Sequence, residues 1–368
     1  MYAAYGVASP FLPAYVSSRG IAPEELGLVL GTATLVRLVS APLAGRAGDR
    51  LDALRGVLVT CIALGAFVTL GYLRVEDFES FLAVALLHAA ALAPMAVLAD
   101  ALTLGAAKRE GFEYGRVRGT GSAAFIAGTL LSGQLIAGQG LGVIVWLQAG
   151  LLAAAAVAAA RVPRIHHQRQ ERAPGGVGAL LRIPAFRNLV LVAALVLGSH
   201  AMHDSFAVIR WSAAGVSPSA TSLLWSEAVL AEVLVFFFLG PLLVTRLGPA
   251  GALGLAALAG MVRWVAMATS ADLLVLALVQ PLHGLTFALL HLACMRLIAR
   301  IVPDGLEGTA QAIYATVGVG GATALMMYAS GALYARFGAT GFMAMAALCL
   351  VALPLAWRLR ATRPIPGR

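Results

Sequence analysis

The chain has 368 residues, of which 60% are hydrophobic and only 12% are charged, and its mean hydropathy is +0.88. Soluble domains carry roughly 25% charged residues, so this composition excludes an ordinary soluble globule, a disordered chain and a disulfide-rich scaffold. In so apolar a chain, the net charge of +9 indicates a membrane protein with basic cytoplasmic loops and no binding of nucleic acid.

Apolar runs separated by charged residues, glycine or proline predict twelve membrane-spanning helices. A spanning helix needs about 20 apolar residues. The runs do not alternate apolar and polar residues, as the strands of a membrane β-barrel would. The predicted fold class is therefore all-α, a polytopic membrane protein with two bundles of six helices. The predicted spans are 1–17, 24–44, 54–73, 80–106, 115–138, 140–161, 187–209, 218–246, 248–268, 271–300, 306–334 and 338–358.

The first predicted span is short, because a helix of about 16 residues reaches only roughly 24 Å and a bilayer core measures about 30 Å. The segment has neither the basic start nor the cleavage site of a signal peptide. We therefore hypothesise that the true start codon lies upstream, by about ten residues if the helix is to span the core. The mass of the native N-terminus would test this.

Basic residues predict the orientation and the domain boundaries. By far the larger share of the 26 Lys and Arg falls in alternate connections, which places these connections and both termini in the cytoplasm. The longest polar stretch lies between the sixth and seventh spans. The predicted organisation is an N-terminal six-helix bundle, a cytoplasmic linker, a C-terminal six-helix bundle and a cytoplasmic tail, at 1–161, 162–186, 187–358 and 359–368.

This layout of six spans, a basic loop and six spans resembles the major facilitator superfamily, in which two pseudo-symmetric bundles rock about a central site. After the second span, the sequence GRAGDR at 45–50 resembles the cytoplasmic loop motif of that superfamily. Gly45, Asp49 and Arg50 fit the motif, while Asp52 stands at its inner glycine position. The resemblance implies a gating loop in which Asp49 pairs with arginine across the bundles; the alternative is a charged tight turn.

Three further stretches resemble the 3-phenylpropionic acid permease branch, which is related to lactose permease and to nucleoside–proton symporters. They are YGRVRGTGS at 114–122, GTAQAIY at 308–314 and GALYARFG at 331–338. The resemblance covers nearly the whole chain. It implies a multi-pass protein of the bacterial inner membrane that works as a monomer.

The resemblance to lactose permease implies that Asp100 and Arg118 bind substrate, although they could equally form a structural ion pair. The family's sugar-stacking tryptophan is replaced by Phe125, which offers only an apolar face and favours an aromatic or less polar ligand. Arg37 is a lone cation in the second span and could meet either an anionic substrate or an acid. His88 and His291 are interpreted as polar residues whose hydrogen bonds are satisfied.

The seventh span carries His200, His203 and Asp204, whose spacings of three and four place them on one helical face. Such a group could relay a proton, because imidazole titrates near neutral pH. It could equally be a structural polar cluster, or bind a metal.

Glu232, Arg263 and His283 resemble the Glu–Arg–His cluster that couples protons to transport in lactose permease. The second carboxylate of that cluster, one turn after the histidine, is absent, because Thr286 stands there. Glu232 or Asp204 would then be the carboxylate that titrates.

The sequence therefore predicts a proton-coupled transporter and no enzyme. The resemblance implies a small organic substrate, with an aromatic carboxylate such as 3-phenylpropionate expected. The alternatives are a sugar or nucleoside symporter, a drug or metabolite antiporter, and an intramembrane metalloenzyme. The partners expected are the substrate, protons and lipid, and no metal or cofactor is predicted. The sequence contains no G-x-x-x-x-G-K-[ST] motif, which excludes an ATPase of the P-loop type within this chain.

Overall fold

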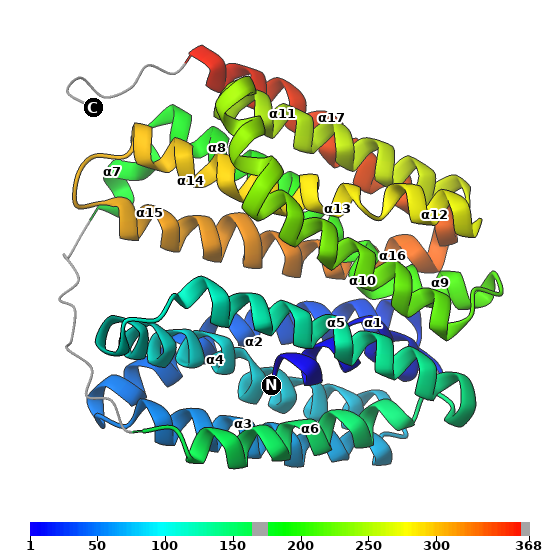
Figure 1. The fold of residues 1–368 in the computed structure, drawn as a ribbon. Helices are drawn as coiled ribbons and strands as arrows, with labels where there is room; N and C mark the ends of the chain where they lie inside the picture. The colour runs from blue at the N-terminus through cyan, green and yellow to red at the C-terminus, as the bar shows by residue number, and fades with distance from the viewer. Residues whose placement is uncertain (164–175, 362–368) are drawn as a thin grey trace. The chain divides into compact units, whose positions relative to one another are not determined.

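A computed structural model describes residues 1–163 and 176–361, and within these ranges the chain forms helices joined by turns and bends (Figure 1). Nine helical segments of the described chain are apolar and long enough to cross a membrane. Large apolar side chains such as Phe67, Trp146 and Leu274 are exposed, as expected where the surroundings are lipid. The prediction of an all-helical membrane protein is confirmed at this level.

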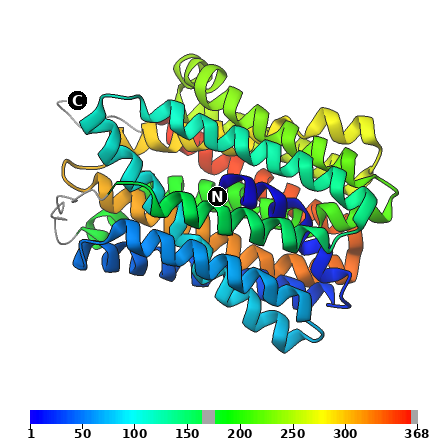
Figure 2. The same cartoon turned by 60° about the horizontal axis from the view of Figure 1, so that its bottom comes forward.

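The described residues separate into two compact units, which are 1–163 with 215–223, and 176–214 with 224–361. In the first unit, α1 packs on α5, α2 on α4, and α3 on both α4 and α6. These helices run side by side in both views (Figures 1 and 2). The elements of this unit are α1 (Tyr2–Ser17), α2 (Pro23–Arg50), α3 (Leu54–Gly71), η1 (Tyr72–Arg74), α4 (Phe78–Glu110), α5 (Tyr114–Gln139) and α6 (Val143–Ala160), with the first residues of α10 (Pro218–Leu234).

Glycines let α1 and α5 approach each other closely. A side chain at Gly6 would collide with the backbone carbonyl of Phe125, and one at Gly128 would collide with that of Ala3. The Thr129 hydroxyl donates a hydrogen bond across the contact to the Gly6 carbonyl, at 2.9 Å. Small residues that admit close backbone contact, with polar bonds between helices, drive helix association in lipid, because lipid tails supply no hydrophobic force between helices.

Helix α2 is longer than predicted and contains the whole gating motif. The predicted span ended at residue 44, but Gly45, Asp49 and Arg50 are helical. The turn comes at Asp52, which has a φ of 47°. Asp tolerates this left-handed conformation better than most residues, so it replaces the glycine expected there. The residues predicted to form a gating loop therefore lie on the last turns of a helix and not in a loop.

In the second unit, α11 packs on α17 and α14, and α8 packs on α17. Glycine positions interrupt the two longest apolar segments, Pro218–Thr269 and Glu307–Arg358, with φ values of 69° at Gly248 and 55° at Gly338. The longer elements are α8 (Pro184–Gly198), α9 (His200–Ala213), α10 (Pro218–Leu234), α11 (Gly240–Thr269), α14 (Leu290–Ile301), α16 (Ala322–Phe337) and α17 (Phe342–Arg358).

Short elements complete the second unit. Three of them are π-helical, a form that is rare and is often found at functional sites. These three are η2 (Val235–Leu239), η3 (Leu285–Leu289) and η4 (Tyr314–Gly321), and the others are α7 (Val177–Arg182), α12 (Leu273–Val279), α13 (Leu282–Gly284), α15 (Glu307–Ile313), η5 (Gly338–Gly341) and η6 (Leu359–Ala361).

The predicted linker and tail are only partly within the described residues. Positions 164–175 of the linker and 362–368 of the tail lie outside them. The end of the predicted linker forms α7, which packs on α8 and α15 and buries Leu180 completely.

Candidate functional site

A polar network lies in the second unit around Arg263 of α11, whose side chain is fully buried. Its Nη1 donates to His283 Nδ1 at 3.1 Å, and its Nη2 lies 3.3 Å from His203 Nε2 and 3.1 Å from Gln280 Oε1. His203 lies on α9 and His283 on α13, while Gln280 directly follows α12. A buried charge of this kind persists only with partners, because burying it unpaired is very costly.

The arginine determines which tautomer each histidine adopts. Because a guanidinium can only donate, His203 Nε2 and His283 Nδ1 must accept. In a neutral imidazole the other nitrogen then carries the proton. His203 Nδ1 lies 3.2 Å from Asp204 Oδ1, and His283 Nε2 lies 3.5 Å from Glu232 Oε2. The result is one continuous chain of polar groups, in the order Asp204, His203, Arg263, His283 and Glu232, which we call the coupling chain.

The coupling chain is buried at its centre and open at its ends. His203 is 4% exposed, whereas the Asp204 and Glu232 side chains are 44% and 33% exposed. The two carboxylates are therefore the accessible ends of the chain, and the arginine between the histidines is its shielded centre.

Tryptophan rings enclose the coupling chain on the side of His203. The His203 ring stacks on Trp225 with centroids 4.8 Å apart, and it lies within 6 Å of the Trp211 and Trp264 rings. The Arg263 guanidinium lies over Trp264 at 4.6 Å, a cation–π contact. These apolar walls strengthen the electrostatic interactions inside the chain by lowering the local dielectric constant.

His200 lies beside the coupling chain and does not extend it. Its Nδ1 is 3.0 Å from the Val196 carbonyl, and its Nε2 is 2.9 Å from the Thr286 hydroxyl. Among the described residues, no group of three or more His, Cys, Asp or Glu is arranged to hold a metal ion.

Sequence reasoning missed Gln280 and undervalued Thr286. Gln280 is fully buried, accepts from Arg263, and places its Nε2 3.4 Å from His203 Nε2. Its signal was an amide within the apolar run three residues before His283. Thr286 was noted only as a missing carboxylate, yet it is the partner of His200.

In the first unit, Asp100 and Arg118 do not form the ion pair that was the alternative to a role in substrate binding. No salt bridge between these two described residues is present. Arg118 instead lies over the Tyr2 ring at 4.9 Å, and Asp100 interacts electrostatically with Tyr2 and Tyr114. Phe125 is half-buried on α5, and its carbonyl lies at the crossing with α1.

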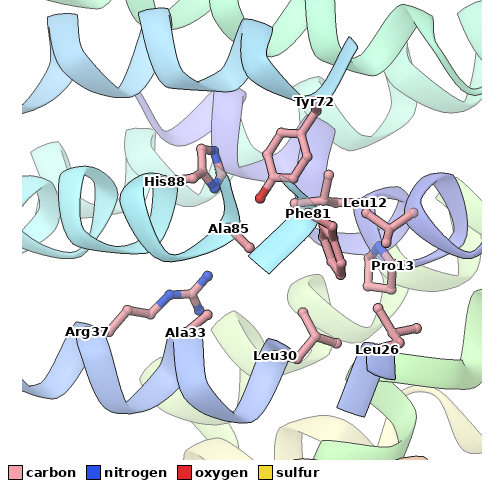
Figure 3. Close-up of a pocket in the computed structure, with 11 residues that line it drawn as sticks. Leu12, Pro13, Leu26, Leu30, Ala33, Arg37, Tyr72, Phe81, Ala85 and His88 are labelled. Carbon is pink, nitrogen blue, oxygen red and sulfur yellow. The ribbon is translucent and has the colours of Figure 1, made fainter. Parts of the chain in front are cut away.

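Arg37 lies at a small cavity of the same unit, together with His88 and Tyr72 (Figure 3). No hydrogen bond to His88 Nε2 is found among the described residues, so its interpretation as a satisfied polar residue is wrong. His291, by contrast, has Nδ1 at 3.2 Å from the Tyr314 hydroxyl, and its interpretation is confirmed.

Comparison with known proteins gives consistent similarities. A family model described as the MFS_1 like family matches residues 1–345. The probable 3-phenylpropionic acid transporter of Escherichia coli (strain K12) is 34% identical over 364 residues, which cover 95% of this chain and 92% of that protein. Maltose permease of Geobacillus stearothermophilus is 26% identical over 87% of this chain and 82% of its own length. The crystal structure of the nucleoside transporter NupG matches with a TM-score of 0.82 at 17% identity, covering 98% of this chain and 95% of NupG.

Proposed function

The chain belongs to the MFS_1 like family of the major facilitator superfamily, and we propose that it is a symporter that carries protons together with an aromatic monocarboxylate. It is a membrane transporter and not an enzyme. The observation that carries the proposal is the coupling chain, in which a buried arginine joins two neutral histidines and two carboxylates.

The formal charges of the coupling chain account for the transport of one proton per cycle. With both histidines neutral, Asp204 and Glu232 contribute two negative charges and Arg263 one positive charge, so the formal charges of these five residues sum to −1. Net charge within a membrane span is costly. Binding one proton at either carboxylate removes it, and the neutral chain can then change conformation with the substrate bound.

Release of the proton depends on the contacts of Arg263. A guanidinium near a carboxylate favours its charged form, while apolar surroundings favour the neutral form. Alternating access that strengthens the Arg263–His283–Glu232 connection in one state and weakens it in the other would bind the proton on one side of the membrane and release it on the other.

Aromatic rings beside Glu232 and His283 favour an aromatic substrate. Phe287 stacks on His283 with centroids 5.5 Å apart, and Phe236 lies one turn after Glu232. Phe287 is 40% exposed and Phe236 is 39% exposed. An aryl group placed against them would lie next to the coupling chain. The name of the Escherichia coli relative, a probable 3-phenylpropionic acid transporter, supports the same class of substrate.

The proposed membrane arrangement is twelve spans with both termini in the cytoplasm, in the bacterial inner membrane. Dividing the segments of 52 residues at Gly248 and Gly338 gives two spans from each, and α1 supplies a further short span of 16 residues. The proposed boundaries of the two bundles are 1–161 and 187–358, and the proposed active form is a monomer.

The gating residues Gly45, Asp49 and Arg50 are proposed to act at the cytoplasmic end of α2. In the first unit, Asp100, Arg118 and Phe125 are proposed to contact the substrate, and Asp100 and Arg118 would do so beside Tyr2.

A sugar or nucleoside is the second candidate substrate class. The similarity to maltose permease supports it at 26% identity. Phe125 argues against it, because a phenyl ring cannot hydrogen-bond a hydroxyl group.

Uptake by proteoliposomes tests the proposal. An inward proton gradient is imposed and the uptake of labelled 3-phenylpropionate is followed, with a galactoside and a nucleoside as competitors. Gradient-driven uptake that neither competitor blocks is the expected result. If the galactoside or the nucleoside accumulates instead, the substrate belongs to the second candidate class. If none of the three compounds is taken up, export is favoured.

A further inference from the structure

The first unit contains a small cavity of about 30 Å³ that the proposed mechanism does not use. Its walls come from α1, α2, η1 and α4, and most of them are apolar side chains such as Leu12, Leu30 and Phe81. Three polar groups also line it, on Arg37, Tyr72 and His88. Figure 3 shows the imidazole, the phenol and the guanidinium around the same space.

His88 lies at the buried end of this cavity with an unsatisfied nitrogen. The residue is 3% exposed, and its Nε2 has no hydrogen-bond partner among the described residues. The Tyr72 ring packs edge-on against the imidazole with centroids 5.3 Å apart. Leaving a buried polar group unpaired is costly, so a nitrogen that lines a cavity is expected to have a partner within it.

The polar groups of the cavity are suited to an anion. Arg37 carries a positive charge, and no ion pair or hydrogen bond of its guanidinium is found in the part of the chain that the structure describes. A guanidinium, a phenol and an imidazole N–H can all donate. No Asp or Glu lines the cavity. The cavity thus offers donors and one positive charge without a counter-charge.

The size of the cavity limits the anion. A volume of about 30 Å³ is well above the roughly 10–15 Å³ that one water requires, so a chloride ion or a carboxylate group fits while a whole aromatic acid does not. Arg37 is exposed, whereas Tyr72 and His88 are buried, which indicates that the cavity opens on the side of Arg37. A carboxylate could enter there while the rest of its molecule stays outside.

We propose that Arg37, Tyr72 and His88 form a binding site for a monovalent anion in the first unit. The anion is either the carboxylate of the transported acid or a free inorganic ion such as chloride. The first form rests on the proposed function, whereas the second does not. In either form, the anion compensates Arg37 and gives His88 Nε2 the partner that it lacks.

Binding to the purified full-length protein in detergent tests this proposal. Titration calorimetry measures the affinity for 3-phenylpropionate and for its uncharged amide. Thermal unfolding measures stabilisation by chloride in a sulfate buffer. Arg37→Gln removes the charge, and Tyr72→Phe removes only a hydroxyl and keeps the ring. Arg74→Gln is the matched control, because Arg74 lies on η1, two residues from Tyr72, but does not line the cavity.

If the anion is the substrate carboxylate, Arg37→Gln weakens 3-phenylpropionate binding at least tenfold and Tyr72→Phe weakens it several-fold. The binding of the amide then stays unchanged in these variants, and Arg74→Gln binds 3-phenylpropionate as the wild type does. If the anion is inorganic, chloride raises the melting temperature of the wild type and not of Arg37→Gln, whatever happens with 3-phenylpropionate.

The proposal is overturned if Arg37→Gln changes neither the binding of 3-phenylpropionate nor the response to chloride. This failure is separate from a failure of the proposed function. If the wild type shows proton-driven uptake of 3-phenylpropionate and Arg37→Gln does not change binding or the chloride response, only the proposed anion site is refuted. A chloride response that depends on Arg37, without any binding of 3-phenylpropionate, would retain the site and remove the proposed substrate.

Discussion

The substitution Glu232→Gln tests the coupling chain most directly. The amide has the shape of the carboxylate and can still accept a hydrogen bond from His283 Nε2, which lies 3.5 Å from Glu232 Oε2. It cannot take up a proton at neutral pH. The substitution therefore leaves the contacts in place and fixes the chain in a charge state equivalent to the protonated one.

The charge count gives the size of the effect. A formal charge of −1 on the coupling chain means one proton per transport cycle. Each pH unit across the membrane then contributes about 1.4 kcal/mol, which is tenfold accumulation of the substrate. A monoanion that travels with one proton carries no net charge, so the membrane potential should have no effect. In Glu232→Gln, accumulation should fall from about tenfold per pH unit to simple equilibration, while exchange continues.

The assay compares uptake and counterflow in proteoliposomes. Gradient-driven uptake reports coupling, and counterflow of labelled against unlabelled substrate reports the conformational change alone. Glu227→Gln is the matched control, since Glu227 lies on the same helix, α10, and is not among the five residues that make up the coupling chain.

Two results would refute this reasoning. Accumulation by Glu232→Gln equal to that of the wild type would remove Glu232 from coupling. Wild-type accumulation that responds to the membrane potential would contradict the count of one proton.

Three other perturbations test separate parts of the structure. Gly128→Ala places a methyl group against the backbone of α1 and should lower stability by roughly 1–3 kcal/mol in thermal unfolding, whereas Gly138→Ala, with nothing within 4 Å, should not; equal effects would contradict the close helix contact. The Ser80 backbone N–H donates to Asp77 and lowers the pKa of that exposed carboxyl, so its stabilisation is present at neutral pH and is lost as the pH falls below about 4. The melting-temperature difference between wild type and Asp77→Ala should therefore narrow in acid, and a constant difference would exclude the charged cap. Phe287→Leu should raise KM for an aromatic acid about two- to tenfold and leave an aliphatic acid unaffected; equal changes would exclude ring contact.

Apolar runs were sufficient to predict most helices but not where they end. The break near residue 247 was predicted and occurs at Gly248, where glycine adopts a positive φ that continues no helix. The end of α2 was predicted six residues early, because loss of hydropathy marks the limit of an apolar run and not the end of a helix. The helix ends instead at Arg50, just before a local turn at Asp52 that hydropathy does not detect.

The members of the coupling chain could be predicted one by one, because an ionisable residue stands out within an apolar run. Their order of contact could not. Arg263 meets His203 only because α11 and α9 bring them together, and Gln280 was overlooked because a neutral amide carries a weaker signal than a charge. For Asp100 and Arg118 the spacing left a substrate role and a structural ion pair open, and the structure shows no ion pair between them.

The three tryptophan rings around His203 give this transporter an intrinsic fluorescent probe. Three of the five tryptophans surround the imidazole, and the other two are exposed. If His203 gains a proton or turns away during the cycle, a cation appears on the face of the Trp225 indole or the stacking is lost. Either event changes the emission of the protein, so the transport cycle can be timed from intrinsic fluorescence without attaching a label.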